Sequence, residues 1–154
     1  MADYELWNAE RAAQIIAANQ HLDGAALPIF NALQAAFGHV PPQAVAMVAQ
    51  ALNISRAEAH GVVSFYHDLR HSPPGRRVIK LCRAEACQST GGAAAAEFLL
   101  ASLGITWGET TTDGKITVEG VYCLGLCAVS PAALVDGTPV GRLDGISLAE
   151  LALA

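Results

Sequence analysis

Four cysteines are the residues of this 154-residue sequence whose spacing points to chemistry. Cys82 and Cys87 form a C-x4-C pair, 35 residues follow, and Cys123 and Cys127 form a C-x3-C pair. Four thiolates gathered at one place can hold a [2Fe-2S] cluster or a tetrahedral zinc ion. Each pair falls where a predicted strand ends and a loop begins, so two adjacent strands would bring all four sulfurs together.

The spacing within each pair favours iron–sulfur over zinc. Structural zinc sites usually use tight C-x2-C knuckles, whereas these wider loops suit the broader two-iron cluster. A zinc-stapled interaction module stays open as the alternative. A redox dithiol is disfavoured because the sequence has no C-x-x-C, and disulfides are disfavoured because we expect a reducing, cytoplasmic location.

The neighbours of the cysteines suit an anionic cluster. Gly91, Gly92 and Gly125 would permit close approach of the backbone, whose N–H groups can donate to the sulfurs. Arg83 directly follows the first cysteine, where a positive charge would offset the negative charge of a cluster. A solvated surface arginine is the alternative interpretation of Arg83.

The second half of the sequence predicts the elements that must position the cysteines. Residues with strand and helix propensity alternate, and Asp113-Gly114 and Asp136-Gly137 are turn signals. The predicted elements are a strand over 77–81, a helix over 91–103, a strand over 115–122, a hairpin of 132–135 with 139–143, and a last helix from the capping-box pair Ser147 and Glu150. This order predicts an α/β sandwich.

The first half predicts a helical bundle, because apolar residues recur there at helical spacing. The expected core faces are Leu6, Ala9, Ala13 and Ile16, then Ala26, Phe30, Leu33 and Phe37, then Val45, Val48 and Leu52. Gly38 should end the second helix, Pro42 should start the third, and Ser55 with Glu58 should start a fourth. From Gly61 onward Val62, Val63, Phe65 and Tyr66 favour extended structure. We predict a helical domain over 1–73 and an α/β domain over 74–154.

Composition excludes several classes of function. The net charge is -5, from 14 acidic and 9 basic residues, with no basic stripe for nucleic acid. No apolar run approaches the ~20 residues that span a bilayer, so we expect no direct membrane contact. The start has no basic and then apolar leader, which is the basis for the cytoplasmic expectation. Without G-x-G-x-x-G or a nucleophile–base pattern, the chain is expected to be non-catalytic on its own.

Four stretches resemble a known family. They are VYCLGLCAVSP at 121–131, GHVPP at 38–42, GVVSFYHDLR at 61–70 and KLCRAEACQSTGG at 80–92. Together with the four-cysteine pattern, they resemble the thioredoxin-like [2Fe-2S] ferredoxins, a family with members in respiratory complex I, bidirectional NAD-linked hydrogenases and formate dehydrogenases. The stretches at 61–70 and 80–92 look most similar to the gamma subunit of NAD-dependent, molybdenum-containing formate dehydrogenase.

The resemblance implies a helical N-terminal domain followed by a thioredoxin-like α/β domain. It implies that Cys82, Cys87, Cys123 and Cys127 are the ligands of one [2Fe-2S] cluster. It also implies an electron-transfer subunit that docks on a flavoprotein subunit, which carries FMN and binds NAD. A large molybdenum and iron–sulfur catalytic subunit would be the second partner, with the molybdenum cofactor there and not on this chain. The equivalent subunit of complex I or of a hydrogenase is the alternative.

Overall fold

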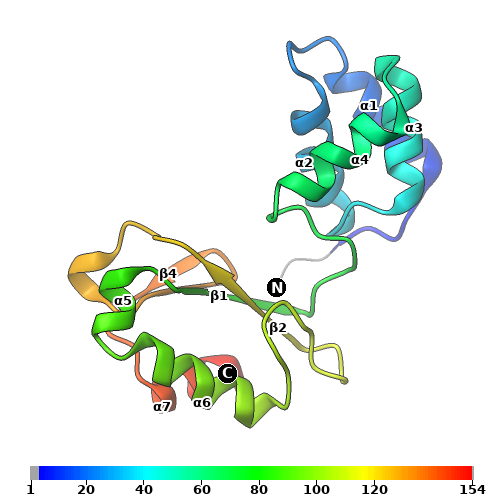
Figure 1. The fold of residues 1–154 in the computed structure, drawn as a ribbon. Helices are drawn as coiled ribbons and strands as arrows, with labels where there is room; N and C mark the ends of the chain where they lie inside the picture. The colour runs from blue at the N-terminus through cyan, green and yellow to red at the C-terminus, as the bar shows by residue number, and fades with distance from the viewer. Residues whose placement is uncertain (1–3, 154) are drawn as a thin grey trace. The chain divides into compact units, whose positions relative to one another are not determined.

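The chain divides between Pro73 and Pro74 into two compact units. The computed structural model describes residues 4–153, so residues 1–3 and 154 of the two predicted domains lie outside the described residues (Figure 1). The first unit contains four helices, which are α1 (Ala9–Asn19), α2 (Ala26–Phe37), α3 (Pro42–Leu52) and α4 (Arg56–Phe65). Each unit is described by itself below.

Three helix ends of the first unit lie at the residues that the sequence indicates. Gly38 ends α2 with a φ of 76°, a left-handed conformation that glycine adopts at little cost. Pro42 occupies the first turn of α3, where its missing N–H is no loss. Ser55 and Glu58 form a complete capping box at the start of α4, with Ser55 N–H donating to Glu58 Oε2 at 2.8 Å.

The core of the helical unit contains most of the predicted apolar side chains, with one face predicted wrongly. Phe30, Leu33 and Phe37 of α2 are buried, as expected. In α1, however, Ala12, Ile15 and Ile16 face the core, and the predicted Leu6 precedes the helix with 92% of its surface exposed. Ala9 and Ala13 are exposed as well. Alanines occur all around α1, so the isoleucines, which bury more apolar area, determine its orientation.

The extended segment predicted from Gly61 is also wrong, because α4 continues to Phe65. Val63 lies in the helix with only 1% of its surface exposed and packs in the core with Ala59. Burial of this helical face outweighs the weak preference of β-branched residues for strands. Phe65 remains 72% exposed at the end of α4.

The second unit is a four-stranded sheet with helices. Its elements are β1 (Arg77–Cys82), α5 (Glu85–Ser89), α6 (Gly92–Leu103), β2 (Ile116–Val121), the 3-10 turn η1 (Cys127–Val129), β3 (Ala133–Val135), β4 (Thr138–Val140) and α7 (Gly145–Leu153). The strand order is β2-β1-β3-β4, with β1 parallel to β2 and antiparallel to β3. The α/β class predicted from the sequence is confirmed.

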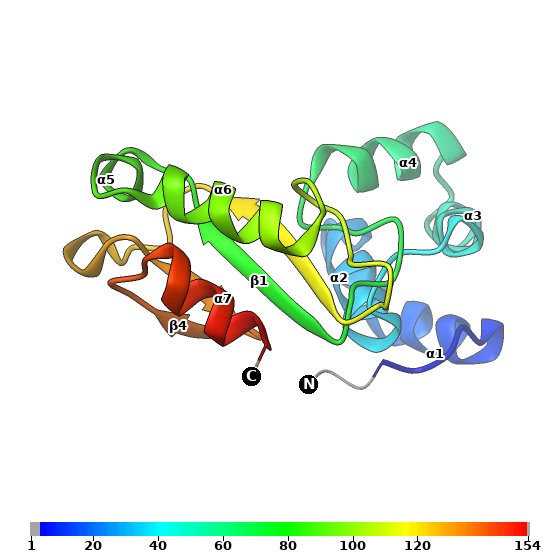
Figure 2. The same ribbon diagram turned by 90° about the horizontal axis from the view of Figure 1, so that it is seen from below.

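Helices α6 and α7 lie side by side on one face of this sheet (Figures 1 and 2). The core between the helices and the sheet is apolar, with Ile79 of β1, Val118 of β2 and Leu99 of α6 fully buried. Leu148 of α7 closes the same core. In both views, α5 and the η1 turn lie at one end of the sheet, beyond the last residues of β1 and β2.

The last helix starts two residues earlier than the predicted Ser147. Ser147 N–H donates to Asp144 Oδ1 at 2.8 Å, and Asp144 N–H donates to the Ser147 hydroxyl at 2.9 Å. Asp144 therefore caps α7, and Ser147 occupies the reciprocal position inside the first turn. The predicted pairing of Ser147 with Glu150 placed the capping box one turn too late.

The outer edge of β2 is bonded by the loop that precedes it. Gly108 N–H donates to Val118 O at 2.8 Å, and Thr111 N–H donates to Ile116 O at 2.9 Å. Thr110 forms an antiparallel bridge with Thr117. The backbone groups along this part of β2 thus have partners on both sides of the strand.

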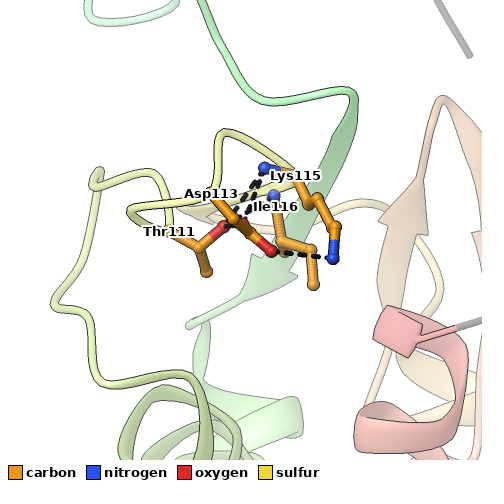
Figure 3. Close-up of polar contacts among 4 residues, drawn as sticks. All are labelled: Thr111, Asp113, Lys115 and Ile116. Atoms are coloured by element: carbon orange, nitrogen blue, oxygen red, sulfur yellow. Dashed lines mark hydrogen bonds and ion pairs between the residues drawn. The ribbon is translucent and has the colours of Figure 1, made fainter.

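A polar turn at Asp113-Gly114 leads into β2 (Figure 3). Asp113 Oδ1 accepts from the Thr111 hydroxyl at 2.6 Å and from Lys115 N–H at 3.0 Å, and Asp113 Oδ2 lies 3.0 Å from Lys115 Nζ. The hydrogen bond from Thr111, followed by the contacts with Lys115, lowers the pKa of Asp113 to about 2. Gly114 follows with a φ of 68°, which confirms the turn predicted here.

No helix within residues 4–153 has the length and apolar character needed to cross a lipid bilayer.

We predict that the Asp113→Asn substitution lowers the thermal unfolding midpoint at neutral pH. The folded-state pKa of Asp113 lies below the ordinary value of 3.8, so the ionised carboxylate stabilises the fold above about pH 4, and this contribution is lost as the pH falls toward 2. Circular dichroism melts should therefore show a difference between the parent and the variant that shrinks on acidification. Asp23→Asn, the same change at an exposed loop residue, should leave the midpoint unaltered. A difference for Asp113→Asn that stays constant down to pH 2 would contradict the assignment.

Candidate functional site

The four cysteines lie at one end of the sheet because β1 and β2 run in parallel. Cys82 is the last residue of β1 and pairs with Val121, the last residue of β2. Parallel strands finish at the same edge of a sheet, so the loops that follow them start side by side. Arg83 N–H donates to Val121 O at 2.7 Å and extends this pairing one residue beyond β1.

The first pair is buried. Cys82 and Cys87 expose only 8% and 2% of their surfaces. Cys87 lies on α5, a five-residue helix that the sequence analysis did not predict. Ala84 precedes α5, and its carbonyl accepts from Cys87 N–H at 3.0 Å. The short helix therefore turns the chain back, and Cys87 packs with Cys82 and Ala132 in one small buried cluster.

The second pair is exposed and lies on a tightly curled loop. The sulfurs of Cys123 and Cys127 are 4.0 Å apart. Cys123 has a φ of 65° and Gly125 a φ of 75°, so two left-handed residues bend the loop within three positions. A left-handed conformation is uncommon for a residue with a side chain, and it commonly accompanies a functional constraint.

The curled loop packs against the first pair. Leu124 and Leu126 of this loop contact the buried cluster of Cys82, Cys87 and Ala132. The two cysteine pairs, 35 residues apart in sequence, therefore share one site.

These contacts shift the acidity of three thiols. Burial raises the pKa of Cys82, but the hydrogen bonds to its sulfur outweigh burial, so the pKa is lowered. Burial, followed by the neighbouring Cys82, raises the pKa of Cys87. The hydrogen bond with Cys123, and then the charge of Cys123, raises the pKa of Cys127. The sulfurs thus influence one another, as expected for groups that converge on one centre.

Small apolar side chains and one glycine complete the site. Ala132 is buried against Cys82 and Cys87, and Ala84, Leu124 and Leu126 pack around them. A Cβ on Gly92 would lie 2.6 Å from the Cys87 carbonyl oxygen, so only glycine permits this approach of α6. No other atom of the chain lies within 4 Å of a Cβ built on Gly91 or Gly125, and both residues adopt a positive φ.

The donor set fits a [2Fe-2S] cluster. The four cysteines lie at the end of β1 and in the loops that follow β1 and β2. Burial raises the pKa of Cys82, but hydrogen bonds, most of them from backbone N–H groups, lower it overall. A cluster held by four thiolates carries negative charge, which such N–H donors stabilise. Within residues 4–153, no three His, Cys, Asp or Glu side chains are gathered tightly enough to hold a single metal ion.

Sequence reasoning did not find the aromatic residues near the site. The guanidinium carbon of Arg83 lies 4.6 Å from the centre of the Trp107 ring and 5.9 Å from that of Tyr122. No spacing signal connects Arg83 to Trp107, because the contact depends on how the loop before β2 folds back. The sequence alone therefore could not decide between the two interpretations of Arg83, which are charge compensation and simple solvation.

The sequence matches one family model, that of the thioredoxin-like [2Fe-2S] ferredoxins, over residues 12–153. One component of the NADH-quinone oxidoreductase from Pseudomonas aeruginosa is 32% identical over 125 residues, which are 80% of this chain and 75% of that protein. The component of the same name from Escherichia coli (strain K12) is 31% identical over 150 residues, 96% of this chain and 90% of that protein.

A similar solved structure is the NAD+-reducing [NiFe]-hydrogenase in the H2-reduced state, with a TM-score of 0.63 and 28% sequence identity. The alignment covers 92% of this chain and only 21% of the hydrogenase chain. Most of that larger chain therefore has no counterpart here. The extent of the family match and these relatives show that this chain belongs to the thioredoxin-like [2Fe-2S] ferredoxin family, which confirms the cofactor predicted from its cysteines.

Proposed function

We propose that this chain is a non-catalytic electron-transfer subunit of an NAD-linked oxidoreductase, with Cys82, Cys87, Cys123 and Cys127 as the ligands of its [2Fe-2S] cluster. The observation that carries the proposal is the contact between the two loops, in which Leu124 and Leu126 pack against the buried Cys82 and Cys87. When bound, a [2Fe-2S] cluster accepts and returns one electron at a time.

Each of the two loops would supply two of the four cluster ligands. Cys82 and Cys87 are buried, so two of the ligands would be shielded from water. The loop with Cys123 and Cys127 is exposed, so it presents the other two ligands to solvent. Tyr122, with 73% of its surface exposed, lies next to this side. We infer that the exposed loop faces the flavoprotein subunit.

A second, more specific proposal concerns the complex to which this chain belongs. We infer an NAD-dependent formate dehydrogenase, with FMN and the NAD site on the flavoprotein subunit and the molybdenum cofactor on a large catalytic subunit. The stretches at 61–70 and 80–92 support this choice by their resemblance to its gamma subunit. NADH-quinone oxidoreductase and an NAD+-reducing hydrogenase are the alternatives, since the relatives described above belong to these complexes.

Replacing any one of the four cysteines with serine should abolish or strongly reduce cluster binding, because each supplies one sulfur ligand. The measurements are iron and sulfide content, visible absorption, and the EPR signal after reduction of anaerobically prepared full-length protein. His21→Ala, in the helical unit, should retain the full signal. Parent protein containing one zinc and neither iron nor sulfide would instead support the zinc-stapled interaction module.

Gly92→Ala should destabilise the chain by about 1–3 kcal/mol, because the added methyl group collides with the Cys87 backbone. Cluster content should fall as well, since α5 would have to shift. Gly61→Ala is the matched control: it lies inside α4 with open space around it, and should stabilise by about 0.5–1 kcal/mol. Urea unfolding measures both variants. Equal stability of the Gly92→Ala variant and the parent would contradict the close approach.

The formate assignment predicts that the native complex purified through this chain contains molybdenum and reduces NAD+ with formate. Metal analysis and parallel assays with formate, hydrogen, and NADH plus a quinone distinguish the three parents. Nickel with hydrogen-dependent NAD+ reduction would assign the chain to a hydrogenase. Quinone reduction by NADH without molybdenum or nickel would assign it to a NADH-quinone oxidoreductase.

A further inference from the structure

Arg83 directly follows the buried Cys82, and although it is exposed its side chain contacts two aromatic rings. Its guanidinium carbon lies 4.6 Å from the centre of the Trp107 ring and 5.9 Å from that of Tyr122. Cations are attracted to the faces of aromatic rings, and arginine does this more often than lysine. Two rings from different parts of the chain therefore hold one positive charge beside the cysteines.

Both backbone polar groups of Arg83 are hydrogen-bonded. Its N–H donates to Val121 O at 2.7 Å, and its carbonyl accepts from Gln88 Nε2 at 2.5 Å. A Cβ on Gly120 would lie 2.7 Å from Cδ of Arg83, so the side chain crosses β2 at the one position that carries no side chain. Glycine inside a strand lowers the stability of the strand, but Gly120 leaves room here for the side chain of Arg83.

The charge of Arg83 is not neutralised by an acidic side chain. Within residues 4–153, Arg83 forms no ion pair, whereas Arg77 pairs with Asp136 at 3.4 Å. Glu97 lines the same small cavity of about 130 Å³ as Arg83 and Trp107, yet no ion pair joins Glu97 to Arg83. A guanidinium remains protonated at any ordinary pH, so the positive charge is permanent.

We propose that the positive charge of Arg83, placed beside Cys82, raises the reduction potential of the cluster. This inference rests on the proposed function. Reduction adds one electron, and no bond forms or breaks. The net charge of the cluster with its four thiolates changes from roughly -2 to -3. A fixed positive charge stabilises the more negative state more strongly, so Arg83 favours the reduced form.

The test is a redox titration of the full-length, cluster-loaded chain, with dithionite as the electron donor and EPR as the readout. Arg83→Gln removes the charge and keeps a planar polar side chain of similar length. It should lower the equilibrium constant for one-electron reduction by about threefold to tenfold, where tenfold corresponds to a potential 59 mV more negative. Arg83→Lys keeps the charge and should show less than half of that change on the millivolt scale.

The matched control is Arg76→Gln. Arg76 is exposed just before β1, at the opposite end of the strand from Cys82, and the same loss of charge there should leave the potential unaltered. An unchanged potential in Arg83→Gln would overturn the proposal. An equal shift in Arg83→Lys or in Arg76→Gln would overturn it too, because packing or total charge would then be the cause.

Trp107→Leu keeps the proposal testable if Arg83→Gln does not hold the cluster. This variant retains the charge but removes the ring that the guanidinium contacts. Its equilibrium constant for reduction should fall by less than tenfold, and its potential should depend more strongly on salt than that of the parent. An unchanged potential and salt dependence in Trp107→Leu would overturn the role of the aromatic rings. Failure of the proposed function is a separate result, because the parent chain itself would then show no [2Fe-2S] signal.

Discussion

The contacts of Leu124 and Leu126 with Cys82 and Cys87 are the ones on which the site depends. They join two loops that are far apart in sequence. They form only because β1 and β2 are parallel and finish together, with Cys82 opposite Val121. A parallel pair needs a long crossover connection, and α6 supplies it. The packing of α6 on the sheet thus helps to align the ends of β1 and β2.

The two cysteine pairs differ in their surroundings, although they share one site. Cys82 and Cys87 lie among small apolar side chains, where a sulfur is shielded from water. Cys123 and Cys127 are exposed. Because burial and hydrogen bonding to sulfur both set the potential of an iron–sulfur cluster, the two sides of this site would contribute unequally. Arg83, which stacks on Trp107, follows Cys82 directly and is itself exposed.

Local signals predict the helix ends and turns correctly, whereas contacts between distant residues do not follow from them. Gly38, Pro42 and the pair Ser55 and Glu58 determine backbone geometry within one turn, so the sequence alone locates these helix ends. The Asp136-Gly137 turn likewise joins β3 to β4, with both residues at positive φ. The orientation of α1 and the helical state of Val62 and Val63 depend on what packs against them. Propensity cannot supply that information.

For the candidate site, too, local features could be predicted from the sequence and contacts between distant residues could not. The cysteine pairs and their place at strand ends could be predicted, because spacing and strand propensity are local properties. The short helix that carries Cys87 could not be predicted, because five residues are too few to show a helical pattern. The left-handed conformation of Cys123 could not be predicted either, because residues with a side chain seldom adopt it. Trp107 and Tyr122 beside Arg83 were missed because that cluster of side chains forms only when the loop before β2 folds back.

The bonded outer edge of β2 has a consequence for assembly. An unpaired edge strand invites another chain to extend the sheet, which is a common route to aggregation. Here the loop before β2 already occupies that edge through Gly108, Thr110 and Thr111. The opposite edge is β4, which is only three residues long and contains Pro139, a residue without an N–H to donate. Neither side favours strand addition, so neighbouring subunits would have to recognise this unit through its side chains.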